Sequence, residues 1–213
     1  FFNDAPAHID RLAADLEKRE LGHYVYRAIT AEDQARIWEL RKAALGLTMS
    51  QMGDAKSISF VEDTAVAPEH LHDYIARFQQ ILARHEIPSG FYAHAAVGLL
   101  HIRPVVDMKS ANGVEKFSLI AHEVADLVLE YGGALSGEHG DGLVRAPFQE
   151  KMFGSVLYEA FCQLKDGFDP EGLLNPGKIV HAPPLTANLR FGTDYKTNKP
   201  KTAFDFSDFG SIA

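Results

Sequence analysis

Apolar residues recur every three or four positions in five stretches of the chain, which is the pattern of a helix with one buried face. Pro68 begins one stretch, Thr30 can cap another, and Gly132-Gly133 ends a third. The sequence therefore predicts helices over 6–20, after Thr30, and over 68–85, 114–131 and 148–164. The stripe of the strongest stretch consists of Phe117, Ile120, Val124, Leu127 and Val128.

Three other segments have the composition of strands. Residues 23–29 alternate between apolar and polar side chains, 56–61 form a short run, and 90–103 contain two short strands joined by a turn. Strands separated by helices, with one hairpin, favour an α+β fold in which helices cover a mixed or antiparallel sheet. The segment 181–213 has no periodicity and carries two consecutive prolines, which is typical of an extended connector.

The composition excludes several classes of protein. With 46% hydrophobic and 23% charged residues, the 213-residue chain can bury a core. Its net charge of -8 makes nucleic acid and anionic lipid poor partners. The single cysteine, Cys162, excludes a disulfide framework and any cluster held by several thiolates of this chain. The longest apolar run, 95–100, is too short for a transmembrane segment. The chain begins at Phe1 without a leader pattern, so we expect a piece of a longer polypeptide.

Two histidines in the predicted hairpin are candidate metal ligands. A turn at Val97-Gly98 would place His94 directly opposite His101. Opposed residues have Cβ atoms about 4.5–5.5 Å apart, from which two imidazoles can bind one ion. The alternative is a pair of core histidines that are hydrogen-bonded to backbone carbonyls.

A glycine-rich segment, 136–142, supplies further polar groups. Its glycines allow positive φ and close approach of a flat ligand, but it has neither the lysine nor the spacing of a phosphate-binding loop. Glu138 would complete a His-His-Glu set with His94 and His101, which is a pattern of catalytic metal sites with open positions. The adjacent His139 could then face a substrate. The alternative is a polar turn after a helix.

Three motifs, in order, resemble the C-terminal, substrate- and metal-binding domain of FAD-linked oxidases. They are the histidine motif 94–101, Gly-Glu-His-Gly-Asp-Gly at 137–142, and Asp-Pro-Glu-Gly-Leu-Leu-Asn-Pro-Gly-Lys at 169–178. This is the glycolate oxidase, D-lactate dehydrogenase and D-2-hydroxyglutarate dehydrogenase group of the vanillyl-alcohol oxidase superfamily. The resemblance implies an α+β domain over 1–180 with a mostly antiparallel, ferredoxin-like sheet. Residues 181–213 resemble the connector of long members that continue into an iron–sulfur domain.

The resemblance also implies a role for each matching residue. His94, His101 and Glu138 match the metal ligands, and His139 matches the general base beside the flavin. The substrate would be held by Arg41 and Lys56, while Asn175 and Lys178 lie in the segment that approaches the flavin and, with His139, would contact it. The last motif has a structural alternative, because Asp169 followed by Pro170 is also a good helix cap.

One position departs from the family pattern. The family has an Asn two residues after the second histidine, where this chain has Arg103, and Val97 and Leu99 replace an Asp and an Asn within the motif. Arg103 could bind the second carboxylate of a dicarboxylate such as 2-hydroxyglutarate. The alternative is a surface arginine that ends a strand.

The resemblance implies that the chain is part of a dehydrogenase that oxidises a 2-hydroxy acid, D-2-hydroxyglutarate or D-lactate, by hydride transfer to FAD. We expect the FAD to be held mostly by a missing upstream domain, a divalent zinc, manganese or iron ion at the His-His-Glu set, and a 4Fe-4S cluster only downstream. The isolated chain should be inactive. We expect the protein to be cytoplasmic, or peripheral to the membrane through an electron-transfer partner. Two other functions stay open: a metal-dependent hydrolase, and a non-catalytic assembly module with a structural metal.

Overall fold

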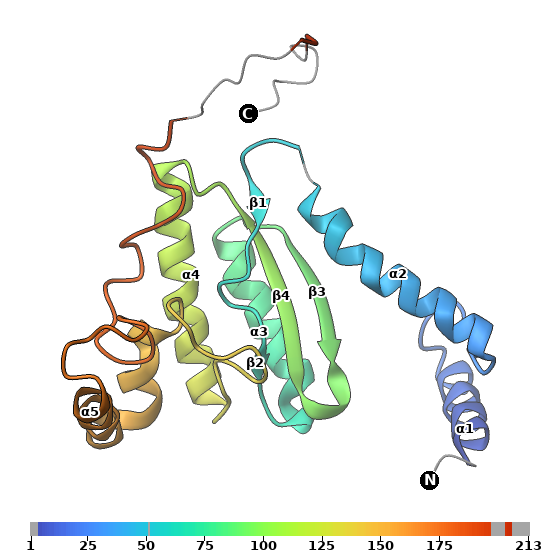
Figure 1. Cartoon of the computed structure of the whole chain (residues 1–213). Helices are drawn as coiled ribbons and strands as arrows, with labels where there is room; N and C mark the ends of the chain where they lie inside the picture. Colours follow the sequence, from blue (N-terminus) through green and yellow to red (C-terminus); the bar gives the residue numbers. More distant parts are fainter. Residues whose placement is uncertain (1–3, 51, 197–202, 206–213) are drawn as a thin grey trace. The chain divides into compact units, whose positions relative to one another are not determined.

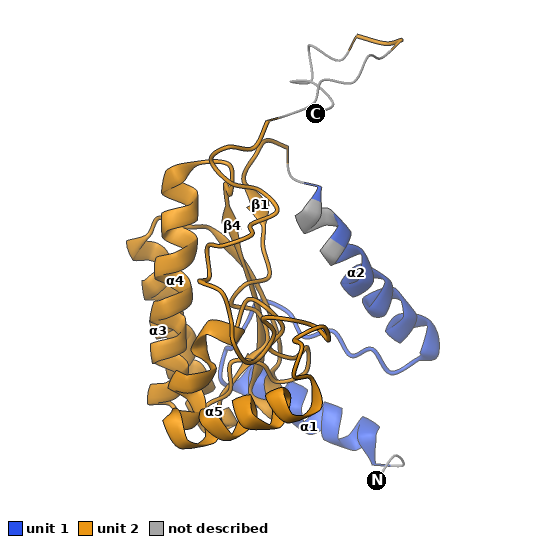
Figure 2. Ribbon diagram, turned by 60° about the vertical axis from the view of Figure 1, so that its left-hand side comes forward, with its two compact units in different colours: residues 1–50 blue, residues 51–213 orange. Residues whose placement is uncertain are grey.

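The computed structural model describes residues 4–50, 52–196 and 203–205. The chain divides into two compact units, 1–50 and 51–213, which are coloured separately in Figure 2. Among the described residues, no helix is long and apolar enough to cross a membrane.

The first unit contains two helices, α1 (Ala5–Lys18) and α2 (Ala31–Met49). Thr30 caps α2 as predicted, because its hydroxyl accepts a hydrogen bond of 3.1 Å from the Asp33 backbone amide. The strand predicted over 23–29 is wrong: this segment has no regular secondary structure and belongs to no ladder among the described residues, and Tyr24 is 82% exposed. A strand requires a neighbouring strand to bond with, and the described elements of this unit are both helical.

The second unit contains a small antiparallel sheet. Its strands are β1 (Lys56–Ser57), β2 (Thr64–Ala65), β3 (Ser89–His94) and β4 (Leu99–Val106). β4 lies in the centre, with β3 along one edge and β1 and β2 one after the other along the opposite edge (Figure 1). The sheet and its helices confirm the α+β class.

Two long helices, α3 (Leu71–Arg84) and α4 (Ala111–Glu130), cover one face of the sheet (Figure 1). A short 3-10 turn, Pro68–His70, precedes α3, so the predicted helix over 68–85 is confirmed. Alternate residues of β4 enter the core, where they meet the apolar stripe of α4 that the sequence predicted. The fully buried core side chains include Tyr74, Phe78, Leu100, Ile102, Val106, Ile120, Val124 and Val128.

The β3–β4 hairpin differs from the prediction in its register. His94 pairs with Leu99, and His101 pairs with Tyr92, so the two histidines are diagonal neighbours and not directly opposed. The reason is a longer turn, in which a 3-10 segment (Ala95–Val97) is followed by Gly98 at φ +71°. Because the difference is an even number of residues, both histidines stay on one face of the sheet.

After the glycine-rich segment comes α5 (Gln149–Phe168), which confirms the last predicted helix. Its backbone leaves helical geometry at Gly154, where φ is 76°. Beyond α5, the apolar side chains of Leu185, Leu189 and Phe191 pack against the core. Part of the predicted connector, 197–202 and 206–213, lies outside the described residues, and the proposed boundary at 180 stays a prediction.

Candidate functional site

The candidate site lies on the face of the sheet opposite α3 and α4. Because side chains alternate along a strand, His101 and Arg103 face away from the core that Leu100 and Ile102 enter. Tyr92, which pairs with His101, stacks on its ring with centroids 4.3 Å apart and an interplanar angle of 17°. His94 meets the same imidazole edge to face, at a centroid separation of 5.2 Å.

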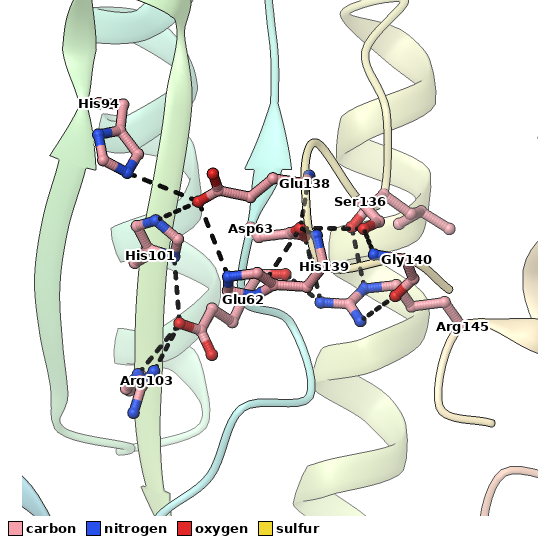
Figure 3. A network of polar contacts seen from close by, with 11 residues as sticks. Glu62, Asp63, His94, His101, Arg103, Ser136, Glu138, His139, Gly140 and Arg145 are labelled. Atoms are coloured by element: carbon pink, nitrogen blue, oxygen red, sulfur yellow. Dashed lines mark hydrogen bonds and ion pairs between the residues drawn. The ribbon is translucent and has the colours of Figure 1, made fainter. Parts of the chain in front are cut away.

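An interruption in the edge of the sheet brings two acidic residues to this face. Between the pairs Ser57–Val105 and Thr64–Leu100, six residues, 58–63, lie along only four residues of β4, 101–104. The extra length is taken up in a segment that ends with Glu62 and Asp63, where Asp63 has φ 63°. Both side chains are buried, at 3% and 0% exposure, beside the histidines (Figure 3).

Asp63 holds the glycine-rich loop against the sheet. Its Oδ2 accepts hydrogen bonds from the backbone amides of Glu138 (2.9 Å) and His139 (2.6 Å) and from the Ser136 hydroxyl (2.9 Å). At Gly137 the loop approaches β4 so closely that a Cβ would lie 2.4 Å from Leu99 Cδ1. These contacts direct the side chains of Glu138 and His139 toward the histidines of the hairpin (Figure 3).

Arg145 completes this support from the other side of the loop. Its guanidinium donates to the carbonyls of Leu135 (3.0 Å) and Gly140 (3.1 Å) and to the carbonyl of Glu62. It also pairs with the Asp63 carboxylate at 3.3 Å. A buried arginine and a buried aspartate therefore connect both ends of the loop to the interrupted sheet edge.

This support predicts that Asp63→Ala loosens the loop. Hydrogen bonds to a charged group contribute about 1.5–3 kcal/mol, and 1.36 kcal/mol corresponds to a factor of ten. We expect the amides of Glu138 and His139 to exchange about 10–100-fold faster in hydrogen–deuterium exchange of the full-length protein. The control is Asp126→Ala, which removes the exposed pair with Lys151. Unchanged exchange in Asp63→Ala would contradict this role.

The structure brings His94, His101 and Glu138 together. Glu138 Oε1 lies 3.0 Å from His101 Nε2 and 3.5 Å from His94 Nε2. The three ligand atoms all lie within 4.8 Å of one another. His101 is buried, whereas His94 and Glu138 are 42% and 44% exposed, so the cluster is open to a ligand on one side. The spacing suits one ion shared by two imidazoles and one carboxylate.

His101 Nε2 has an unusual environment. His101 Nδ1 lies 3.1 Å from Glu62 Oε1, and a carboxylate can only accept, so in the neutral ring Nδ1 carries the proton and Nε2 presents a lone pair. Nε2 is buried and, among the described residues, has no hydrogen bond, although Glu138 Oε1 is only 3.0 Å away. Burial lowers the pKa of His101 more than Glu62 raises it, which favours the neutral ring. Two lone pairs that converge without a hydrogen between them fit a cation.

His139 lies at the edge of this cluster. Its Nε2 is 3.7 Å from Glu138 Oε1, and its ring centroid is 5.3 Å from that of His101. His139 could also form a ligand set with Glu62 and His101. We favour the His94–His101–Glu138 set, because Glu62 Oε1 already accepts hydrogen bonds from Arg103.

Arg103 pairs with the buried Glu62. Its Nε and Nη2 lie 3.2 and 2.7 Å from Glu62 Oε1, and the arginine side chain is 21% exposed. Burial by itself raises the pKa of Glu62, but hydrogen bonds from Arg103 and Ser59 and the charge of Arg103 outweigh it, so the net pKa is lowered. Glu62 is therefore a carboxylate at neutral pH, and it links Arg103 to His101.

The family of the chain follows from its sequence as a whole. The family described as "FAD linked oxidases, C-terminal domain" matches residues 3–179. The chain belongs to this family. Curated relatives carry matching names: it is 46% identical over 144 residues to D-2-hydroxyglutarate dehydrogenase of Haemophilus influenzae, 40% over 183 to that of Escherichia coli, and 33% over 157 to D-lactate dehydrogenase of Archaeoglobus fulgidus.

These relatives are much longer than the chain. The three alignments cover 68%, 86% and 73% of this FAD-oxidase domain, but only 14%, 18% and 33% of the respective relatives. The chain therefore corresponds to one part of each relative, and most of their length lies outside it.

Within the second unit of this FAD-oxidase domain, three other predicted site residues lie apart from the histidine cluster: Lys56, Asn175 and Lys178. Lys56 pairs with Val106 at the far end of β4, on the strand face that enters the core. Asn175 and Lys178 lie in the turns after α5, and among the described residues no hydrogen bond or ion pair joins them to the cluster. Arg41 lies in α2 of the first unit, with its guanidinium 5.4 Å from the Trp38 ring centroid. The roles of these residues stay predictions.

The third family motif has a clear structural part. Asp169 ends α5, and its carboxylate accepts hydrogen bonds of 2.9 Å from the backbone amides of Leu173 and Leu174. It also pairs with Lys165. Asp169 thus shapes the turn after α5 and does not cap the start of a helix.

Glu62 and Asp63 were not among the candidates that the sequence motifs identified. Apart from Ser59 and Thr64, the other residues of the segment 58–66 are apolar, and charged residues are seldom buried unless they are paired. Two adjacent acids in such a run are a signal that could have marked them. Apart from Ser59, however, their partners lie 39 to 83 residues away, and only the folded structure identifies them.

Proposed function

We propose that the chain is the substrate- and metal-binding part of an FAD-dependent dehydrogenase that oxidises D-2-hydroxyglutarate to 2-oxoglutarate. The observation that carries the proposal is the convergence of His94, His101 and Glu138, with the lone pair of His101 Nε2 directed at Glu138. Relatives named D-2-hydroxyglutarate dehydrogenase, at 40–46% identity, support this substrate over D-lactate.

His94, His101 and Glu138 would hold a divalent ion, and their imidazole and carboxylate groups suit zinc, manganese or iron. Such an ion, when bound, supplies a Lewis acid that lowers the pKa of the substrate hydroxyl, while FAD accepts the hydride from the substrate carbon. Exposure of Glu138 and His94 leaves this side of the cluster accessible to a substrate oxygen.

His139 would take the hydroxyl proton. Its imidazole is 47% exposed beside Glu138, and its backbone amide is fixed by Asp63. Among the described residues, the carboxylates nearest to its two ring nitrogens are 3.9 and 3.7 Å away, so neither nitrogen forms a hydrogen bond with them. General-base catalysis of this kind contributes about 10²–10⁴-fold. Asn175 and Lys178 would lie near the flavin, and FAD and any iron–sulfur cluster would be held mainly by other parts of the longer protein.

Cationic side chains would bind the two carboxylates of the substrate. Arg41 is proposed for the carboxylate next to the hydroxyl. Lys56 is not assigned to it, because it lies on the opposite face of the sheet from the cluster. Arg103 lies two residues along β4 from His101 on the same face, and successive strand residues rise about 3.3–3.4 Å, so its guanidinium is placed for the distal carboxylate. The hydrogen bonds of Arg103 to Glu62 hold the guanidinium in one orientation.

Arg103→Ala tests the choice of substrate. Loss of a charge-assisted contact to the distal carboxylate should reduce kcat/KM for D-2-hydroxyglutarate about 10–100-fold. D-lactate has no distal carboxylate, so its kcat/KM should fall much less. Arg77→Ala, which removes a surface pair with Glu130, is the matched control. Equal losses of kcat/KM for both substrates would show that Arg103 does not bind the distal carboxylate.

The proposed reaction is tested by anaerobic reduction of the flavin in the full-length protein. D-2-hydroxyglutarate, D-lactate, glycolate and the L-forms are mixed with the enzyme, and the flavin absorbance is followed. We expect rapid bleaching by D-2-hydroxyglutarate. Bleaching by none of these acids, with FAD bound, would contradict the proposed function.

A further inference from the structure

We propose that Glu62 is a positioning residue with two functions: it orients the metal ligand His101, and it anchors Arg103 for the distal carboxylate. This inference rests on the proposed function, because it assumes an ion at His101 and a dicarboxylate substrate. Figure 3 shows Glu62 between the two side chains. Glu62 would therefore affect both metal affinity and substrate choice without contacting the ion or the substrate.

The contacts of Glu62 with His101 and Arg103 converge on one atom. Oε1 lies 3.1 Å from His101 Nδ1 and 3.2 and 2.7 Å from Arg103 Nε and Nη2. With the side chain 3% exposed, water can contribute little to its solvation. A buried charge requires such partners. Besides Ser59, they are one candidate metal ligand and one candidate substrate residue.

The first function concerns the imidazole of His101. Glu62 accepts a hydrogen bond from His101 Nδ1, which leaves His101 Nε2 as the ring nitrogen that faces Glu138. Tyr92 stacks on the ring face at 4.3 Å, so Tyr92 restricts the ring plane while Glu62 restricts rotation within it. A carboxylate behind a ligating histidine orients the ring and raises its basicity, and mutation of such partners typically weakens metal affinity about 10–100-fold.

The second function concerns the guanidinium of Arg103. Glu62 contacts its Nε and Nη2 edge, and the arginine remains 21% exposed. An arginine held along one edge loses less conformational freedom when another edge binds a substrate carboxylate. Arg103 and Glu62 thus form a pair, in which Glu62 anchors the guanidinium of Arg103.

The test uses the full-length protein, with metal removed, titrated with Co²⁺ and followed by its visible absorption. Glu62→Ala should weaken Co²⁺ binding about 10–100-fold. Glu62→Gln keeps an oxygen that can accept from Nδ1, so its loss should be smaller than that of Glu62→Ala but measurable. Glu123→Gln is the matched control, because it alters a His–Glu pair with His85, 2.7 Å long, away from the cluster.

His94→Ala separates the possible failures. If His94→Ala loses Co²⁺ while both Glu62 variants bind like the wild type, Glu62 does not position His101, and the metal site itself stands. If His94→Ala also binds like the wild type, the proposed metal site is wrong, and this inference is overturned with it. If Glu62→Ala fails to fold, the Co²⁺ affinity of Glu62→Gln decides whether Glu62 positions His101.

Substrate choice gives a second readout. The ratio of kcat/KM for D-2-hydroxyglutarate to that for D-lactate should fall in Glu62→Gln as it does in Arg103→Ala. Because both changes act through one guanidinium, the double variant should have the same ratio as Arg103→Ala alone. An unchanged ratio in Glu62→Gln, or additive losses in the double variant, would show that Glu62 does not anchor Arg103.

Discussion

His101→Ala is expected to abolish tight binding of a divalent ion and to reduce kcat/KM for the 2-hydroxy acid about 10³-fold or more. His101 is the buried member of the three-ligand cluster, and its Nε2 is the atom nearest to Glu138 Oε1, at 3.0 Å. A Lewis acid at a developing alkoxide contributes several kcal/mol, and each 1.36 kcal/mol is a factor of ten in rate. Metal content after dialysis and single-turnover flavin reduction measure the two effects.

The matched control for this variant is His122→Ala. His122 lies on α4, where its Nδ1 is 2.8 Å from the Ser118 carbonyl. Among the described residues, no hydrogen bond or ion pair joins it to the cluster. If removal of the buried His101 disturbs folding, His94→Ala removes an exposed ligand of the same cluster. Metal content and activity equal to wild type in both ligand variants would contradict the metal site.

His139→Gln is expected to reduce kcat about 10²–10⁴-fold while the metal content stays at the wild-type level. The side chain is proposed as the base, whereas the backbone amide of residue 139, which bonds to Asp63 at 2.6 Å, remains in the variant. The loop should therefore keep its position and Glu138 its place in the cluster. Anaerobic single-turnover reduction of the flavin measures the rate, and metal analysis of the same sample measures occupancy.

His181→Gln is the control for His139→Gln, because His181 forms an exposed pair of 2.9 Å with Asp166. It should leave the rate unchanged. A kcat for His139→Gln within a few-fold of wild type would show that another group takes the proton. Loss of the metal in the same variant would instead make His139 a ligand, as in the set with Glu62 and His101.

Much of the fold could be predicted because it depends on local periodicity. The apolar stripe of α4 and the glycines that follow it identify a helix and its end from neighbouring residues alone. The strand expected over 23–29 shows the limit of such patterns. Alternation is necessary for a half-buried strand, but a strand also requires a partner, and α1 and α2 of its unit offer none.

The candidate site was only partly predictable for the same reason. His94, His101 and Glu138 carried a motif, and the error in their hairpin register did not matter, because it kept both histidines on one face. Glu62 and Asp63 carried no motif. Their roles depend on an interruption between β1 and β2 and on partners in β4 and the loop, which are distant in the sequence.

We propose above all that His94, His101 and Glu138 form a divalent metal centre where the 2-hydroxy acid binds. Anomalous diffraction from crystals of the full-length protein, soaked with D-2-hydroxyglutarate, tests it most directly. We expect an anomalous peak within coordination distance of His94 Nε2, His101 Nε2 and Glu138 Oε1, with a substrate oxygen beside it. A peak at Glu62, His101 and His139, or no peak in crystals of active enzyme, would contradict it.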